Sequence, residues 1–477
     1  MIRHAPLFAF VLALLAVGCA KAAPPPPPAL GFHPTACGSD YAGLPQRIDC
    51  GTMVVEETRG ANNGRVVELP VVIVHATVAD KKPDPVIYLH GGPGGGVVGG
   101  VAYRLRRSGA VTPDRDWIFF DQRGTGLSKP SLDCGEAPLS DAGVTSDAGV
   151  AILQACGKGF QAQGIDLSQY NSAVIVKDIR DLRQALGITT YNLYGASYGT
   201  RVAMAVMQHD PADLRAVVLS STWPPEASAT GPLGPLVSRN VRKVLGYCAQ
   251  DPVCNAKFPD IEARLDARMS AWLTAPVTKD GKTYTADEMG AFLLDEIYGD
   301  EGARRLPLTI DTVLKGDYRR LDAFIKVQAG YSEGQFFTTL CSEEFPFESP
   351  DKVEDGGGKD PIAAAVARDA RRFFPVCDAF PTGKPDPVEN APLTSDIPTL
   401  MLSADIDAGC PSELSDAAVK RLNRGENYFF PNRMHTIQGS ECARRLVAQF
   451  LETADAKVDA DCIKTDRPSF PFIYDDK

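Results

Sequence analysis

The stretch from Ile188 to Thr200 constrains the fold of this chain more than any other. The apolar run Tyr191 to Tyr194 predicts a short buried strand, and Gly-Ala-Ser-Tyr-Gly follows it directly at 195–199. This order fits the G-x-S-x-G nucleophile elbow, a sharp strand-to-helix turn with a serine at its tip. Such a turn strains the backbone of Ser197, so only glycine fits two positions before and after it. The pattern predicts an exposed serine hydroxyl at the end of a strand.

The five-residue pattern needs support from its surroundings, because 43 glycines in 477 residues would produce it by chance roughly 0.2 times per chain. The surroundings alternate between apolar strand patterns and amphipathic helix patterns joined by short connections. This alternation is typical of a parallel α/β sheet. The predicted elements are strands at 85–89, 116–120, 191–194 and 216–220, and helices at 172–186 and 200–208.

The rest of the chain divides around a helical insertion. Residues 52–58 and 66–78 predict an antiparallel ribbon before the parallel strands, and strands resume at 397–402 and 428–430, followed by a helix at 440–453. Residues 225–390 carry helical patterns broken by proline and glycine, and we expect a mobile loop at 351–360. We therefore predict a mostly parallel sheet, with core residues 36–224 and 391–477 and a large helical cap at 225–390.

The N-terminal residues carry an export pattern. The run from Ala5 to Val17 follows Met-Ile-Arg-His, is too short to span a membrane, and predicts a signal peptide over residues 1–19. Cys19 follows Leu-Leu-Ala-Val-Gly, which resembles a lipobox, so we expect lipid attachment there, with simple cleavage nearby as the alternative. Residues 20–35 include five consecutive prolines and predict a stiff linker. We expect an exported protein of the cell envelope, with no membrane contact beyond this possible anchor.

Eleven cysteines follow Cys19, and export makes disulfides the default expectation for them. No C-x-x-C pair suggests a metal site. Sequence alone does not decide the connectivity. Pairing neighbours in sequence would leave Cys410 over and would join 37 with 50, 134 with 156, 248 with 254, 341 with 377, and 442 with 462.

The formal charge of −11 is spread along the chain without long runs of one sign. This distribution argues against nucleic acid or anionic lipid as the main partner. It is consistent with a cationic ligand.

A serine nucleophile needs a histidine base, which in turn needs a carboxylate to hold its tautomer. Behind an elbow of this kind the chain order is serine, acid, histidine. His209 lies twelve residues along the next helix, about 18 Å from the serine, which is too far. His435, after the last predicted strand, is the remaining histidine downstream of Ser197. A solvent-exposed loop histidine is the alternative interpretation.

Two aspartates, Asp405 and Asp407, follow the strand at 397–402 and both could supply the acid. The oxyanion that forms during acyl transfer needs backbone N–H donors. We expect one from Tyr198, directly after the nucleophile, and one from Gly92 in the glycine loop His90-Gly-Gly-Pro-Gly-Gly-Gly. A phosphate cradle is the alternative for this loop, but it lacks the lysine of a P-loop and the spacing of a dinucleotide fingerprint.

Five ordered motifs together resemble the prolyl iminopeptidase and tripeptidyl aminopeptidase branch of the α/β-hydrolases. They are the glycine loop at 90–96, Asp-Gln-Arg-Gly-Thr-Gly at 121–126, the elbow, Leu-Ser-Ala-Asp-Ile-Asp at 402–407, and the loop of His435. The resemblance spans residues 40–455 and weakens through the insertion. It matches the catalytic acid to Asp407, and it implies that Arg123 braces the loops of the site. The chain departs from the family pattern at Ala408-Gly-Cys410 and at Thr436.

The resemblance implies release of residues or short peptides from free N-termini, with the cap binding the α-ammonium group. A cation there requires a cap carboxylate. Glu343 and Glu344, flanked by aromatic residues, are the first candidates, and solvated surface acids are the alternative. Weaker candidates are Asp295, Glu296, Asp300 and Glu301.

Taken together, the sequence predicts an exported serine exopeptidase that needs no metal or organic cofactor. An esterase or lipase on the same fold is the first alternative, because the same triad serves both chemistries. A non-catalytic envelope binding protein is the second. The oligomeric state does not follow from the sequence.

Overall fold

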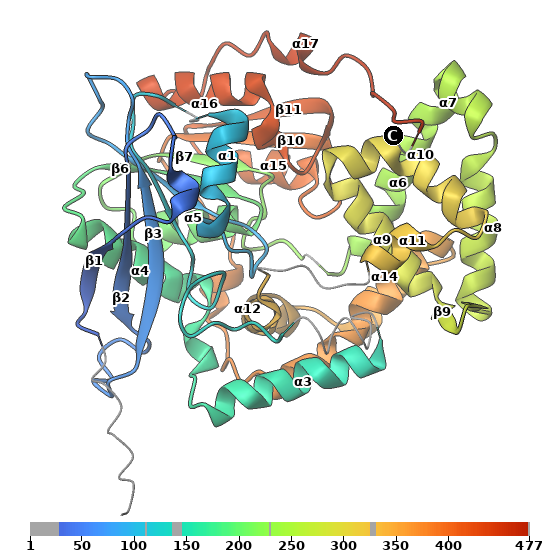
Figure 1. The fold of residues 1–477 in the computed structure, drawn as a ribbon, viewed down its shortest axis with the longest axis horizontal. Helices are drawn as coiled ribbons and strands as arrows, with labels where there is room; N and C mark the ends of the chain where they lie inside the picture. Colours follow the sequence, from blue (N-terminus) through green and yellow to red (C-terminus); the bar gives the residue numbers. More distant parts are fainter. Residues whose placement is uncertain (1–27, 110–111, 136–145, 229, 325–330, 476–477) are drawn as a thin grey trace, which may run out of the picture.

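The computed structural model describes residues 28–109, 112–135, 146–228, 230–324 and 331–475 (Figure 1). The predicted signal peptide, Cys19 and most of the proline run lie outside these residues. Within the described residues one large sheet carries nine strands in the order β1-β2-β3-β5-β4-β6-β7-β10-β11. Figure 1 shows helices on both faces of this sheet and a separate helical lobe beside it.

Six strands form the parallel part of the sheet. They pair in the order β5, β4, β6, β7, β10 and β11. Apart from the edge strand β11, their residues are mostly apolar and buried, as expected for strands covered on both faces. The strands are β4 (Val86–Leu89), β5 (Trp117–Phe120), β6 (Tyr191–Ala196), β7 (Leu214–Ser220), β10 (Thr399–Ile406) and β11 (Gly425–Met434). The predicted α/β sheet is therefore present, with boundaries within a few residues of those expected.

Three antiparallel strands extend the sheet at one edge. They are β1 (Gly31–Thr35), β2 (Ile48–Glu56) and β3 (Val66–Val74), and β3 pairs with β5. The predicted linker at 20–35 is wrong at its end, because residues 31–35 form β1. A strand of five residues, three of them exposed, leaves little trace in its composition, which explains the error.

The core helices follow the strands closely. The helix predicted at 172–186 is α4 (Ser172–Ala185), the helix predicted at 200–208 is α5 (Tyr198–His209), and the helix predicted at 440–453 is α16 (Glu441–Thr453). Within the described ranges the core also contains η1 (Ser39–Tyr41), η2 (Val98–Gly100), α1 (Val101–Ser108), α3 (Asp147–Ala162), η3 (Leu167–Gln169), α15 (Ser412–Val419), η8 (Ile437–Gly439) and α17 (Ile463–Asp466).

The insertion is helical, as predicted, but it packs as two parts. The first part forms the lobe on the right of Figure 1, around its own apolar cluster, which includes Trp272, Phe292 and Leu306. Its elements are α6 (Leu233–Gln250), α7 (Pro252–Lys257), α8 (Ile261–Thr274), a small hairpin β8 (Val277–Lys279) and β9 (Lys282–Tyr284), α9 (Ala286–Tyr298), α10 (Asp300–Leu314), α11 (Arg319–Phe324) and α14 (Pro361–Arg372).

The second part packs mainly on the hydrolase core. Phe337, Leu340 and Phe345 belong to the same buried cluster as residues of α4 and α5. Its elements are α12 (Glu333–Thr339), the π-helical turn η4 (Leu340–Glu344), η5 (Phe345–Phe347), α13 (Pro350–Gly356), η6 (Phe374–Ala379) and η7 (Pro387–Asn390). The loop expected at 351–360 is wrong over its first half, because residues 350–356 form α13 and bury Val353.

Five disulfides are present among the described residues, and each joins the sequence neighbours suggested above: 37 with 50, 134 with 156, 248 with 254, 341 with 377, and 442 with 462. Cys410 is left as a buried free thiol. Every bridge closes a short loop, so each can form from segments that lie close together along the chain.

The C-terminal segment fastens the helical lobe to the core. Arg467 forms an ion pair of 2.5 Å with Asp300 at the start of α10, and the amide of Ile473 donates to the carbonyl of Arg304 at 2.9 Å. Phe470 packs on Tyr247 of α6 with ring centroids 5.6 Å apart. Within the described ranges, no helix is both long enough and apolar enough to cross a membrane.

Candidate active site

The elbow has the geometry that its sequence predicts. Ser197 lies between β6 and α5 with φ of 56° and ψ of −128°, outside the regions that most residues adopt. A Cβ added to Gly195 would approach the carbonyl oxygen of Gly199 to 2.5 Å, and one added to Gly199 would reach the carbonyl oxygen of Leu89 at 2.1 Å. Both glycines are therefore required by direct backbone contacts. The serine is partly exposed while its neighbours are buried.

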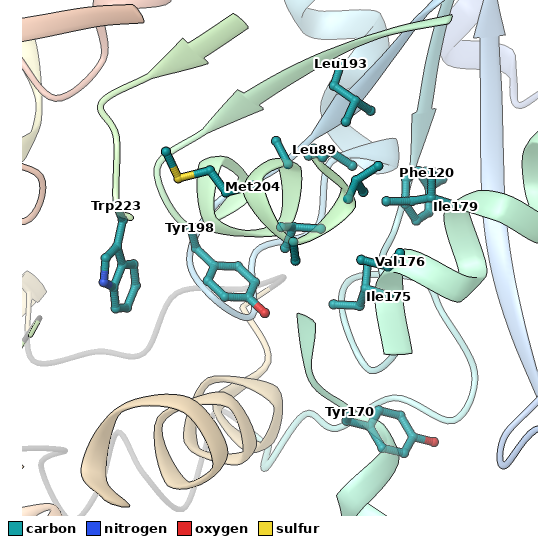
Figure 2. Close-up of a cluster of buried hydrophobic side chains, with 14 of the residues drawn as sticks. Leu89, Phe120, Tyr170, Ile175, Val176, Ile179, Leu193, Tyr198, Met204 and Trp223 are labelled. Atoms are coloured by element: carbon teal, nitrogen blue, oxygen red, sulfur yellow. The ribbon is translucent and has the colours of Figure 1, made fainter. Parts of the chain in front are cut away.

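Helix α5 is anchored from below by aromatic side chains. Figure 2 shows Tyr198 beneath the helix, directed toward Ile175 and Val176 of α4, and Trp223 to the left of the helix. The rings of Tyr198 and Trp223 meet edge to face at 6.0 Å. Since Tyr198 is the first residue of α5, its backbone N–H has no acceptor within the helix. Its side chain fixes the helix while its amide remains available beside the serine.

The structure brings Asp407 and His435 together. Nδ1 of His435 lies 2.9 Å from each carboxylate oxygen of Asp407, and both side chains are almost fully buried. Asp405 has other partners: Lys243, the hydroxyl of Tyr247 at 2.7 Å and the amide of Asn432 at 3.2 Å. Asp405 therefore joins the core to helix α6 of the cap, and Asp407 is the carboxylate that contacts the imidazole.

His435 is held by contacts on two sides. The hydroxyl of Ser221, one residue after β7, donates to the carbonyl oxygen of His435 at 2.9 Å. The ring of Tyr298, the last residue of α9 in the cap, lies 4.7 Å from the imidazole between ring centroids. The cap thus contributes one wall of the site directly at the predicted base.

Cys410 occupies the centre of this group. Its backbone N–H donates to Asp407 at 2.8 Å, and its thiol lies beside the hydroxyl of Ser197. Burial, and then the charge of Asp407, raise the pKa of this thiol well above its ordinary value. Within the described ranges, Ser197 makes no direct hydrogen bond to His435. In enzymes without substrate such bonds are often long and tighten when substrate binds.

The glycine loop lies against the serine. A Cβ on Gly91 would come 2.7 Å from Cβ of Ser197, so Gly91 is the loop residue that packs on the nucleophile. Gly92 follows it with φ of 128°, a conformation that favours glycine. Its role as an amide donor stays a prediction.

Asp121 and Arg123 brace the loops of the site. Asp121 accepts from the amides of Val97 and Val98 at 2.6 and 2.9 Å and of Leu127 at 2.8 Å. Arg123 is fully buried, and its guanidinium forms two bonds of 2.7 and 2.8 Å to Asp178 of α4. These contacts agree with the structural role that we expected for the Asp-Gln-Arg-Gly turn.

His90, at the start of the glycine loop, is not positioned as a base. Its side chain is enclosed by the loop and lies 3.4 Å from the hydroxyl of Tyr88. Burial, with a smaller contribution from Arg104, lowers the pKa of His90 to about 4. The imidazole is therefore neutral at physiological pH and serves as packing.

Glu343 and Glu344 lie beneath α5. Both are 2% exposed, and both pair with Arg201 of α5, at 2.8 and 2.6 Å. Glu343 also accepts from the amide and hydroxyl of Ser172, at 2.6 and 2.9 Å, and that hydroxyl lies 2.9 Å from the hydroxyl of Tyr198. These contacts favour a structural role in supporting the elbow helix. Their role as ammonium ligands stays a prediction without support from their surroundings.

An acidic cavity of about 350 Å³ lies on the cap side of His435. It is bordered by Tyr298 and by Thr436, the residue after the histidine. Its carboxylates are Asp295, Glu296 and Glu301. Three of the four weaker cap candidates therefore line a cavity next to the predicted base.

Asp295 differs from the acidic residues around it. Glu296 pairs with Arg320 at 2.9 Å, and Glu301 pairs with Arg305 at 3.3 Å. Asp295 makes no hydrogen bond or ion pair within the part of the chain that the structure describes. Burial, and then the neighbouring Glu296, raise the pKa of Asp295 above its ordinary value. It is thus the carboxylate of this cavity that is available to a ligand.

Sequence reasoning missed Tyr298 and the placement of Cys410. Tyr298 carries no motif and lies 137 positions before His435, so only the tertiary fold brings them together. Cys410 was visible as the odd cysteine, and its position three residues after Asp407 was the available clue.

Comparisons with known proteins agree with this geometry. A family model described as the alpha/beta hydrolase fold matches residues 84–256, and a second, described as TAP-like protein, matches residues 364–462. This chain belongs to the α/β-hydrolase superfamily. The two matches cover the elbow on one side and the acid and histidine loops on the other. It is a hydrolase of the branch that includes prolyl iminopeptidases and tripeptidyl aminopeptidases.

Individual relatives extend over different shares of the chain. Serine protease Hip1 of Mycobacterium tuberculosis is 27% identical, over 92% of this chain and 93% of that protein. Tripeptidyl aminopeptidase of Streptomyces lividans is 27% identical over 40% of this chain and 38% of its own. Among solved structures, proline iminopeptidase of Mycobacterium smegmatis is 17% identical with a TM-score of 0.41, covering 85% of this chain and 98% of that one.

Proposed function

We propose that this hydrolase is an exported serine exopeptidase that cleaves peptide bonds near free N-termini. The observation that carries the proposal is the Asp407–His435 pair, linked through Cys410 to a serine at the tip of a strained elbow. A serine, histidine and carboxylate at one end of a parallel sheet support acyl transfer. The names of the peptidase relatives support peptides as the substrate class.

In the proposed mechanism, Ser197 attacks the scissile carbonyl carbon while Nε2 of His435 takes the hydroxyl proton. Asp407 holds Nδ1–H toward itself and stabilises the imidazolium that forms. The oxyanion accepts from the amides of Tyr198 and Gly92. The imidazolium then protonates the leaving amine, and water attacks the acyl-enzyme with His435 again acting as base.

The acidic cavity supports the preference for a free N-terminus. An α-ammonium group entering it would meet Asp295, which makes no hydrogen bond or ion pair among the described residues and interacts with Arg320 only through its charge. Such a charge-assisted bond is stronger in a partly enclosed site than in open water. Asp295 thus replaces Glu343 and Glu344 as the proposed anchor, because those two are already paired with Arg201.

Turnover of peptide p-nitroanilides tests the catalytic assignment. We expect Ser197→Ala to lower kcat by about 10⁴-fold or more. Undiminished turnover in this variant would overturn the role of Ser197. Labelling of the wild type by a fluorophosphonate probe excludes a non-catalytic binding protein.

A paired substrate set tests the exopeptidase assignment against an esterase. We expect free peptides to be cleaved faster than their N-acetylated forms, and faster than p-nitrophenyl esters of matched size. Asp295→Asn should raise KM for free peptides by about 10- to 100-fold and leave KM for acetylated peptides unchanged. Glu301→Gln is the matched control, because Glu301 lines the same cavity from the first turn of α10 and is already paired with Arg305. Equal rates on free and acetylated peptides would contradict the exopeptidase proposal.

A further inference from the structure

Three different metal-ligand atom types meet in the predicted active site. A carboxylate oxygen of Asp407, the sulfur of Cys410 and a ring nitrogen of His435 all lie within 4.8 Å of one another. The proposed mechanism uses the carboxylate and the imidazole but gives no task to the thiol. This unused thiol sets the group apart from an ordinary serine hydrolase triad.

The thiol is held in place by the fold of its loop. The amide of Cys410 donates to Asp407 at 2.8 Å, which turns the loop back on the carboxylate. The side chain is 2% exposed and contacts the hydroxyl of Ser197. The ten other cysteines of the described residues are paired in disulfides, so Cys410 carries the free sulfur of this part of the chain.

Sulfur, imidazole nitrogen and carboxylate oxygen are the ligands that Zn²⁺ prefers in proteins. Bond lengths of about 2.0–2.3 Å in a tetrahedral site leave ligand atoms about 3.3–3.8 Å apart. The present ligand atoms, all within 4.8 Å of one another and 2.9 Å apart between Asp407 and Nδ1 of His435, lie close to this spacing. The hydroxyl of Ser197, or a water molecule, is available for the fourth position.

The charges of the group also fit a divalent cation. Asp407 and a Cys410 thiolate together carry two negative charges, and His435 binds a metal as the neutral imidazole. The thiol proton is released to solvent when the metal binds. A Zn²⁺ complex would then have no net charge, which keeps the electrostatic cost of a buried site low.

An acidic cavity lies close to this group, on the cap side of His435. The acidic cavity with Asp295, Glu296 and Glu301 lies beside Tyr298, whose ring packs on His435. Clefts lined by carboxylates raise the local concentration of cations.

We propose that Asp407, Cys410 and His435 form a reversible Zn²⁺ site, and that bound Zn²⁺ inhibits the enzyme. The metal would occupy the carboxylate and the imidazole, so that His435 could no longer accept the proton of Ser197. Inhibition rests on the proposed roles of Ser197 and His435, whereas metal binding depends only on the three ligands.

Fluorophosphonate labelling of Ser197 with ZnCl₂ or with EDTA measures the inhibition without a substrate. We expect micromolar Zn²⁺ to slow labelling of the wild type by at least about tenfold, and EDTA to restore it. For Cys410→Ser, we expect the labelling rate in ZnCl₂ to differ from the rate of the same variant in EDTA by less than about twofold. No effect of Zn²⁺ on the wild type, or equal inhibition of Cys410→Ser, would overturn the proposal.

Cobalt binding provides a readout that does not depend on activity. Co²⁺ bound to a thiolate absorbs in the near ultraviolet, and we expect this band at one equivalent in the wild type and in Ser197→Ala. It should be absent from Cys410→Ser, whose folding is checked by circular dichroism. If that variant does not fold, Ser197→Ala decides the question alone. A missing cobalt–thiolate band there would refute the site even if peptidase activity is established.

Discussion

Nδ1 of His435 lies 2.9 Å from both carboxylate oxygens of Asp407, while Asp405, two residues earlier, faces Lys243 and Tyr247 of the cap. Successive residues at the end of a strand point to opposite sides, but these two aspartates have the same parity. Asp405 lies within β10, whereas Asp407 is the first residue after it, and the pairing with β11 already shifts register between Ala404 and Ile406. The irregular strand end therefore assigns one aspartate to the imidazole and the other to the cap.

This division predicts opposite effects for two similar substitutions. Asp407→Asn should lower kcat by about 10⁴-fold with little loss of stability, because the amide can no longer hold the imidazole in the required tautomer. Asp405→Asn should keep activity within a few-fold and lower the free energy of unfolding by about 1–3 kcal/mol, since a hydrogen-bonded charge is lost. Peptide turnover and urea titration of both variants measure the two effects. If Asp405→Asn lost activity and Asp407→Asn lost only stability, the assignment of Asp407 as the catalytic acid would be wrong.

The elbow glycines give a prediction about folding. Gly199→Ala places a Cβ 2.1 Å from the carbonyl oxygen of Leu89, a contact that only a backbone shift can relieve. We expect a loss of at least about 2–3 kcal/mol in unfolding free energy, together with loss of activity. Gly246→Ala, inside α6 with open space around the added Cβ, should instead stabilise the protein by about 0.5–1 kcal/mol. Thermal unfolding of the two variants distinguishes them, and similar effects would contradict the stated geometry.

Glu389 gives a pH-dependent prediction. Burial, and then the charge of Glu343, raise its pKa from 4.5 to about 7. The folded state therefore holds this proton more tightly than the unfolded state, and stability falls as pH rises from about 4.5 to about 7. Glu389→Gln removes the carboxylate charge and should gain up to about 3 kcal/mol over the wild type at pH 8, with little gain at pH 4. Urea titrations at the two pH values test this, and a gain independent of pH would count against it.

Two disulfides should differ in their contribution to stability. The Cys341–Cys377 bridge spans 36 residues and the Cys248–Cys254 bridge spans 6. Loop-closure entropy predicts a loss of about 4 kcal/mol for the double alanine variant of the first and about 2 kcal/mol for the second. Guanidinium titration under non-reducing conditions provides the comparison. A larger loss from the shorter loop would show that native contacts, and not chain entropy, dominate.

Much of the fold followed from local pattern. The strands at 86–89, 117–120, 191–196 and 214–220 and the helices around the elbow lie where apolar periodicity predicted them. Buried parallel strands are continuous apolar runs, and the apolar residues of amphipathic helices recur every 3.6 residues. Both patterns can therefore be recognised in a single sequence. The edge strand at 31–35 and the helix at 350–356 were missed, because neither has a strong apolar period.

Residue type and chain order placed Ser197 at a glycine-flanked turn, made His435 the expected base and left Cys410 as the odd cysteine. The packed fold was needed to show that Asp407 meets the imidazole, that Glu343 and Glu344 pair with Arg201, and that Cys410 lies beside the serine. Those outcomes depend on which distant side chains compete for each charge and on how loops end, and a buried charge takes the partner that the packed fold brings to it.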